Sequence, residues 1–183
     1  MALFGSYRSN RFVIHQLTRR AVLTRYRGTA LGLIWSLLTP MLMLAIYTFV
    51  FGLVLEIRWP AQEGGLARFP AILFSGMIIH SLLSDCLIQS TTVIADNPQY
   101  VKKVVFPLEA LPWVTVLSAL FQAGISLFVL ILYLLGLLLL ENDHSFGWSV
   151  VFIPLPFVMI SIVCLGIGWF VSAAAVYFRD IGQ

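Results

Sequence analysis

The sequence is short of charge. Only 10% of its 183 residues are Asp, Glu, Lys or Arg, whereas 60% are hydrophobic, and the mean hydropathy is +0.96. A soluble domain carries about 25% charged residues. A soluble globular core is therefore excluded, and the chain is predicted to be a polytopic membrane protein.

The sequence also has little of what catalysis and metal binding require. Its two cysteines and three histidines show no metal-ligand spacing, and H-E-x-x-H, G-x-S-x-G and P-loop motifs are missing. Cys86 and Cys164 lie inside apolar runs, where we expect two small buried hydrophobic residues and no disulfide. We expect no catalytic residue, metal, cofactor or nucleic-acid partner for this chain.

Four apolar runs are long enough to cross a bilayer, which takes roughly 20 residues of helix. They cover about residues 31–55, 69–95, 112–140 and 149–178. No alternating barrel pattern is visible. The predicted fold class is an all-α integral membrane protein, with an N-terminal interfacial helix in residues 1–30 and a transmembrane domain over residues 31–183.

Lysine and arginine placement predicts the orientation. Six arginines precede the first run, two lysines lie between the second and third runs, and one arginine follows the fourth. These nine basic residues lie on one side of the membrane, and two basic residues lie on the other side. The positive-inside rule then predicts a cytoplasmic N-terminus.

The N-terminal segment has an uncharged stripe at helical spacing, which suits a helix lying along the inner leaflet beside anionic headgroups. The alternative is that its arginines only set the topology. Off the stripe, Phe12, Val22 and Leu23 are available to contact a partner or the next span. The stripe consists of Val13, Ile14, Leu17, Ala21 and Thr24.

Asp85 stands inside the second run, where a carboxylate costs on the order of 2.5–3.5 kcal/mol unless it meets water, a partner or a proton. It faces either a polar interior or subunit interface, or a surface that tilting of the helix leaves solvated. His80 is expected to be hydrogen-bonded and structural. The two stand five residues apart and point away from each other on an ideal helix, so they make a weak catalytic pair.

Several short patterns in order along the chain resemble the permease subunit of ABC transporters that export polysaccharides such as O-antigen, capsule or teichoic acid. The patterns are RYRGTALGLIW at 25–35, Pro40, YTFVF at 47–51, Ser75-Gly76, NPQYVKKVVFPLE at 97–109 and YFRDI at 177–181.

The resemblance implies a homodimer in the bacterial inner membrane, paired with two ATP-binding cassette subunits that hold ATP and Mg. It implies a glycan substrate carried on undecaprenyl diphosphate. Family members have six spans, so the chain is expected to cover about the first two-thirds of such a permease. The alternatives are a permease for small lipophilic compounds, an intramembrane enzyme acting on lipid-linked sugars, and a truncated fragment or scaffold that transports nothing.

The resemblance also implies residue roles. Contact with the ATPase falls to Asn97, Pro98, Gln99, Tyr100, Val101, Lys102, Lys103 and Phe106. Arg19, Arg20, Arg25 and Arg27 would hold the interfacial helix or attract the lipid diphosphate, since the arginine fork matches phosphate. Trp35, Tyr47 and Phe51 are the candidates for a glycan path.

Overall fold

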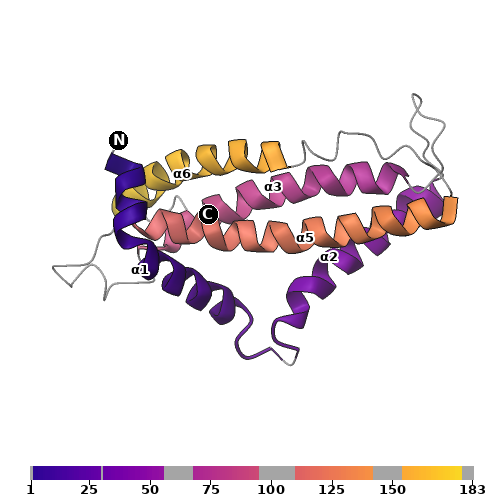
Figure 1. Cartoon of the computed structure of the whole chain (residues 1–183), viewed down its shortest axis with the longest axis horizontal. Coiled ribbons are helices and arrows are strands. Elements are labelled where there is room, and N and C mark those ends of the chain that lie inside the picture. The colour runs from indigo at the N-terminus through magenta and orange to yellow at the C-terminus, as the bar shows by residue number, and fades with distance from the viewer. Residues whose placement is uncertain (1, 30, 56–67, 95–109, 142–153, 179–183) are drawn as a thin grey trace.

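The computed structural model describes residues 2–29, 31–55, 68–94, 110–141 and 154–178. These residues form helices and turns and contain no strand. In chain order the helices are α1 (Ala2–Arg25), α2 (Ile34–Tyr47), the π-helix η1 (Thr48–Val54), α3 (Arg68–Thr92), α5 (Leu111–Glu141) and α6 (Pro154–Tyr177), as Figure 1 shows.

Four helical segments are long and apolar enough to cross a membrane: Ile34–Val54, Phe69–Thr92, Leu111–Leu139 and Leu155–Tyr177. The predicted fold class, all-α with four membrane-spanning helices, is confirmed. The division into an interfacial helix and a transmembrane domain stays a prediction. The fourth span was expected from about residue 149, and residues 149–153 lie outside the described part of the chain.

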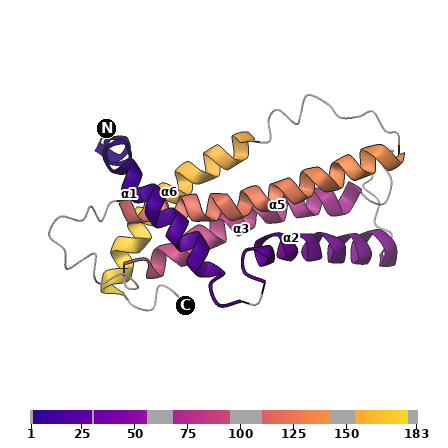
Figure 2. The same cartoon turned by 60° about the horizontal axis from the view of Figure 1, so that its bottom comes forward.

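The long helices run along the molecule in alternating directions. α3 packs against both α5 and α6, while α1 crosses α5 near its start and α2 packs on α5 (Figures 1 and 2). α1 lies at the same end as the last turn of α3, the first turn of α5 and the last turn of α6 (Figure 1). The described elements that flank residues 95–109 therefore share an end with the arginine-bearing helix.

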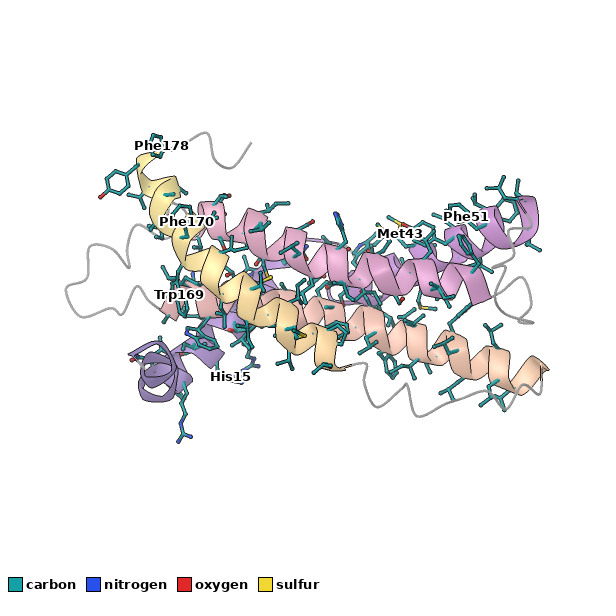
Figure 3. All side chains as sticks on the ribbon, turned by 90° about the horizontal axis from the view of Figure 1, so that it is seen from above. His15, Met43, Phe51, Trp169, Phe170 and Phe178 are labelled. Carbon is teal, nitrogen blue, oxygen red and sulfur yellow. The ribbon has the colours of Figure 1, made fainter. Side chains whose placement is uncertain are left out.

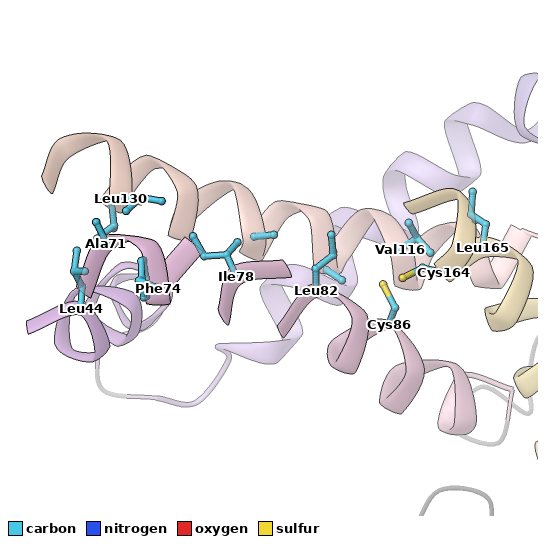
Figure 4. Close-up of a cluster of buried hydrophobic side chains, with 13 residues drawn as sticks. Leu44, Ala71, Phe74, Ile78, Leu82, Cys86, Val116, Leu130, Cys164 and Leu165 are labelled. Carbon is cyan, nitrogen blue, oxygen red and sulfur yellow. The ribbon is translucent and has the colours of Figure 1, made fainter. Parts of the chain in front are cut away.

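The core lies where α3, α5 and α6 meet. Leu82, Cys86, Val116 and Cys164 are among its most buried side chains (Figure 4). Both cysteines are free thiols, 1% and 0% exposed, which confirms the expectation of buried residues without a disulfide.

α6 presents its two faces differently. Trp169 meets Trp113 of α5 edge to face, with ring centroids 6.1 Å apart. The neighbouring Phe170 is 74% exposed, and Phe178, beyond the helix end, is 68% exposed; both are labelled in Figure 3. One face of α6 therefore completes the core while the other is left to its surroundings.

The uncharged stripe of α1 contacts protein. Ile14 is 1% exposed and packs against Ala110 and Val114 at the start of α5, with Leu17 and Ala21 alongside. α5 therefore covers part of the stripe, whereas Thr24 of the same stripe is exposed. That α1 lies along the inner leaflet stays a prediction. Phe12, off the stripe, is 77% exposed.

Two glycines shape the turn from α1 to α2. Gly28 has φ +93° and Gly32 has φ +54°, both in the left-handed region that costs other L-residues roughly 1–2 kcal/mol. A Cβ added to either would meet nothing within 4 Å. The glycines are therefore required by the backbone conformation and not by close packing, and the turn sends α1 and α2 in different directions (Figure 2).

α2 touches the bundle along one ridge, formed by its buried residues Ser36, Pro40 and Leu44. Pro40 has no N–H to donate to the carbonyl four residues earlier, which belongs to Ser36. The side-chain amide of Gln122 on α5 donates to that carbonyl, with Nε2 and O 3.2 Å apart. Breaks of this kind are tolerated in spanning helices because neighbouring helices satisfy the freed backbone group.

Candidate functional site

An ion pair joins the end of α1 to the middle of the bundle. Arg25 donates through two nitrogens to the two carboxylate oxygens of Asp85 on α3, at 3.1 and 3.2 Å. The side chains are 45% and 26% exposed. This contact with Asp85 raises the pKa of the Arg25 guanidinium, which stays protonated. The structure thus provides a partner of opposite charge for the carboxylate that stood out in the sequence.

The next residue makes a second attachment. The Tyr26 hydroxyl donates to Oε1 of Gln122 at 2.5 Å, while the amide nitrogen of Gln122 serves the Ser36 carbonyl. Burial raises the pKa of Tyr26, so its hydroxyl keeps the proton that it donates. One glutamine therefore links the α1–α2 turn, α2 and α5.

A third polar contact lies beside the ion pair, between α3 and α5. The Ser118 hydroxyl lies 2.9 Å from Oε1 of Gln89 and 2.9 Å from the carbonyl oxygen of Thr115, and can donate to either. These three contacts place polar side chains at the junction of α1, α2, α3 and α5.

Three adjacent hollows surround this junction. The α1 hollow, about 410 Å³, lies between Leu17, Arg20, Thr92 and Val114. The middle hollow, about 340 Å³, is lined by Val22, Ile88, Phe121 and other residues. The α2 recess, about 360 Å³, is lined by Thr39, Met43, Tyr47, Met77, Ser81 and Ser126. Arg25 lines all three.

Only some of the other predicted site residues line these hollows. All four predicted arginines are exposed, but only Arg20 and Arg25 line a hollow. His80 is exposed and lines none of the three hollows. The predicted ATPase-contacting residues, Asn97 to Phe106, lie outside the described residues.

Two of the three candidate glycan-path aromatics pack together, where η1 meets α3. The rings of Tyr47 and Phe51 have centroids 6.2 Å apart, and Phe51 also meets Phe69 at 5.7 Å. Tyr47 alone of the three reaches the α2 recess. Trp35 stands apart from this cluster, 38% exposed.

The sequence did not point to Tyr26 or Gln122 as functional residues. The available signal was Pro40, because a proline inside a helix leaves the carbonyl four residues earlier without its backbone N–H donor. Among the described residues no three His, Cys, Asp or Glu side chains gather as metal ligands would. The junction brings together an ion pair and several hydrogen-bonding side chains.

The fold and this junction define a multi-pass membrane protein with a polar site among its helices. The model of the ABC-2 type transporter family matches residues 13–183, and the chain belongs to that family. This confirms, at the level of the family, the resemblance carried by the sequence patterns.

The chain is similar to proteins named O-antigen export system permease protein RfbA. The one from Myxococcus xanthus is 28% identical over 171 residues, which cover 93% of this chain and 61% of the relative. Two from Klebsiella pneumoniae are 27% and 25% identical over 167 residues, covering 90% of this chain and 60% of each relative. The chain therefore spans about three-fifths of the length of these relatives.

Proposed function

We propose that this chain belongs to the permease of an ATP-driven exporter that moves polysaccharide on undecaprenyl diphosphate across the bacterial inner membrane. One observation carries the proposal: the similarity to permeases named for O-antigen export extends over 90% or more of the chain. The four spanning helices agree with a permease role.

The proposal includes a division of labour. The permease pairs with a second copy of itself and with separate ATP-binding cassette subunits, which hydrolyse ATP with Mg. The N-terminus and residues 97–106 lie on the cytoplasmic side. In support, α1 shares an end of the molecule with the last turn of α3 and the first turn of α5, which flank residues 95–109 (Figure 1).

Residue roles follow from the same proposal. Arg20 and Arg25, which line one hollow, would meet anionic lipid headgroups or the carrier diphosphate together with the exposed Arg19 and Arg27. Tyr47, at the α2 recess, is the aromatic residue best placed to contact a sugar ring.

Deleting the gene is expected to remove the surface polysaccharide and to cause lipid-linked polysaccharide to accumulate in the inner membrane, because synthesis continues while export is blocked. Both pools are measured separately by immunoblotting and lipid extraction. Complementation with residues 1–183 then tests whether these residues suffice for export. Unchanged pools in the deletion strain would contradict the proposal and favour a permease for small lipophilic compounds or a non-transporting protein.

The proposed ATPase contact is tested with Tyr100→Ala and Lys102→Glu. Each is expected to weaken copurification of the ATP-binding subunit by about tenfold or more, since removing a central interface residue costs 2 kcal/mol or more. Arg68→Glu is the matched control, because Arg68 begins α3 at the opposite end of the molecule. Equal copurification for all three variants would make residues 97–106 a simple connector.

A further inference from the structure

The three hollows form a series. The α1 hollow and the middle hollow share four residues as walls, and so do the middle hollow and the α2 recess. The first set is Ala21, Arg25, Gln89 and Ser118, and the second is Arg25, Tyr26, Asp85 and Gln122. Neighbouring hollows therefore meet at side chains that line both of them. Most of the shared walls are polar, whereas Val22, Ile88 and Phe121 add apolar surface to the middle hollow.

Arg25 is the one shared side chain that borders every hollow. Its ion pair with Asp85 is 45% exposed on the arginine side. Nearly half of the arginine side chain is therefore left uncovered by the protein. The arginine ends α1, and the turn that follows contains the two positive-φ glycines, at either of which an added Cβ would meet nothing within 4 Å.

We propose that the Arg25–Asp85 ion pair is a displaceable partition, and that withdrawal of Arg25 joins the three hollows into one water-filled passage. The passage runs from the cleft between α1 and α5 to the recess between α2 and α3. It admits water and small polar solutes. Movement of α1 about the Gly28–Gly32 turn draws the arginine away, so the position of α1 controls the passage.

A cysteine reporter in the α2 recess tests this. Ser126 lines the recess and no other of the three hollows, and it stands fifteen residues after Leu111, about 22 Å along α5. S126C is treated in unsealed membrane fragments with charged methanethiosulfonates, which react only where water reaches the thiol. Arg25→Ala is expected to raise the reaction rate about fivefold or more, the effect of losing a modest interaction.

Comparing a cationic with an anionic reagent distinguishes an opened passage from a change in the local electrostatic potential. A passage admits both the trimethylammonium and the sulfonate reagent faster when Arg25 is lost. A purely electrostatic effect accelerates the cation and slows the anion, and this result would overturn the proposal. Exchanging the charges in Arg25→Asp with Asp85→Arg is expected to restore the slow rate.

Three controls complete the experiment. Arg11→Ala removes an exposed arginine of α1 that lines none of the three hollows, and it is expected to leave the rate unchanged. S161C, on α6 and outside all three hollows, should stay slow in every background. The native Cys86 and Cys164 are buried and should remain unlabelled.

Acceleration at S161C or at the native cysteines would mean that the bundle has loosened, which contradicts a local partition. Should Arg25→Ala fail to accumulate, Arg25→Lys provides the comparison, because it keeps the charge and loses the two-nitrogen geometry. The assay requires neither ATP nor glycan. Its outcome is therefore independent of the export test.

Discussion

Replacing Gln122 by Leu is expected to lower the free energy of unfolding by about 1–3 kcal/mol, because it leaves the Ser36 carbonyl without its side-chain donor inside the bundle. Ser36 is 4% exposed, so water does not readily take the place of the amide. The measurement is reversible unfolding in mixed micelles. Gln89→Leu is the matched control, since Ser118 keeps the Thr115 carbonyl as an acceptor.

A double-mutant cycle tests whether Gln122 compensates for the backbone N–H that Pro40 lacks. Pro40→Ala restores a backbone N–H that can serve the Ser36 carbonyl in the ordinary helical way. In that background Gln122→Leu should cost less, leaving mainly the lost contact with Tyr26. The coupling between the two sites is expected to be about 1–2 kcal/mol. Additive effects would show that the glutamine does not compensate for the proline.

Gly168→Val is expected to destabilise the bundle by about 1–3 kcal/mol, since overpacking a tight contact forces its neighbours to move. A Cβ at Gly168 would lie 3.1 Å from Ser90 Oγ on α3 and 3.8 Å from the Pro112 side chain on α5. Small residues at such places let spanning helices approach closely. Gly168→Ala should cost less, because the Ser90 hydroxyl alone has to shift.

Gly166 offers a control on the same helix. A Cβ there would meet nothing within 4 Å, and the residue is exposed. Gly166→Val should therefore leave the unfolding free energy within about 1 kcal/mol, the range of helix propensity. Equal costs at the two glycines would show that the loss comes from helix propensity and not from the α3–α6 contact.

Run length was enough to predict the fold class. Uncharged runs such as residues 112–140 are too long for strands and long enough to span a bilayer, and the α5 helix covers that run. The π-helical end of the first span, Thr48–Val54, had no counterpart in the prediction. Its wider turn is a hydrogen-bond choice that apolar periodicity does not reveal.

The candidate site was predictable only as separate residues. Asp85 stood out as a carboxylate in an apolar run and Arg25 as part of a basic segment, yet neither spacing nor periodicity relates residues sixty positions apart. Their meeting depends on the direction that the Gly28–Gly32 turn gives to α1. Similarly, Pro40 predicts that the carbonyl of Ser36 lacks its backbone donor. Which side chain of α5 donates to that carbonyl instead follows from tertiary packing alone.

The length of α5 makes bilayer thickness a variable for this protein. Its 31 residues extend about 46 Å, against a hydrocarbon core of about 30 Å. At an average tilt of about 20° more than 10 Å of helix still exceeds the core. Ile14 of α1 docks against Ala110 and Val114, at the very start of this helix. In thinner or thicker lipid this contact lies at a different distance from the headgroups. The position of α1 relative to the membrane surface therefore depends on bilayer thickness.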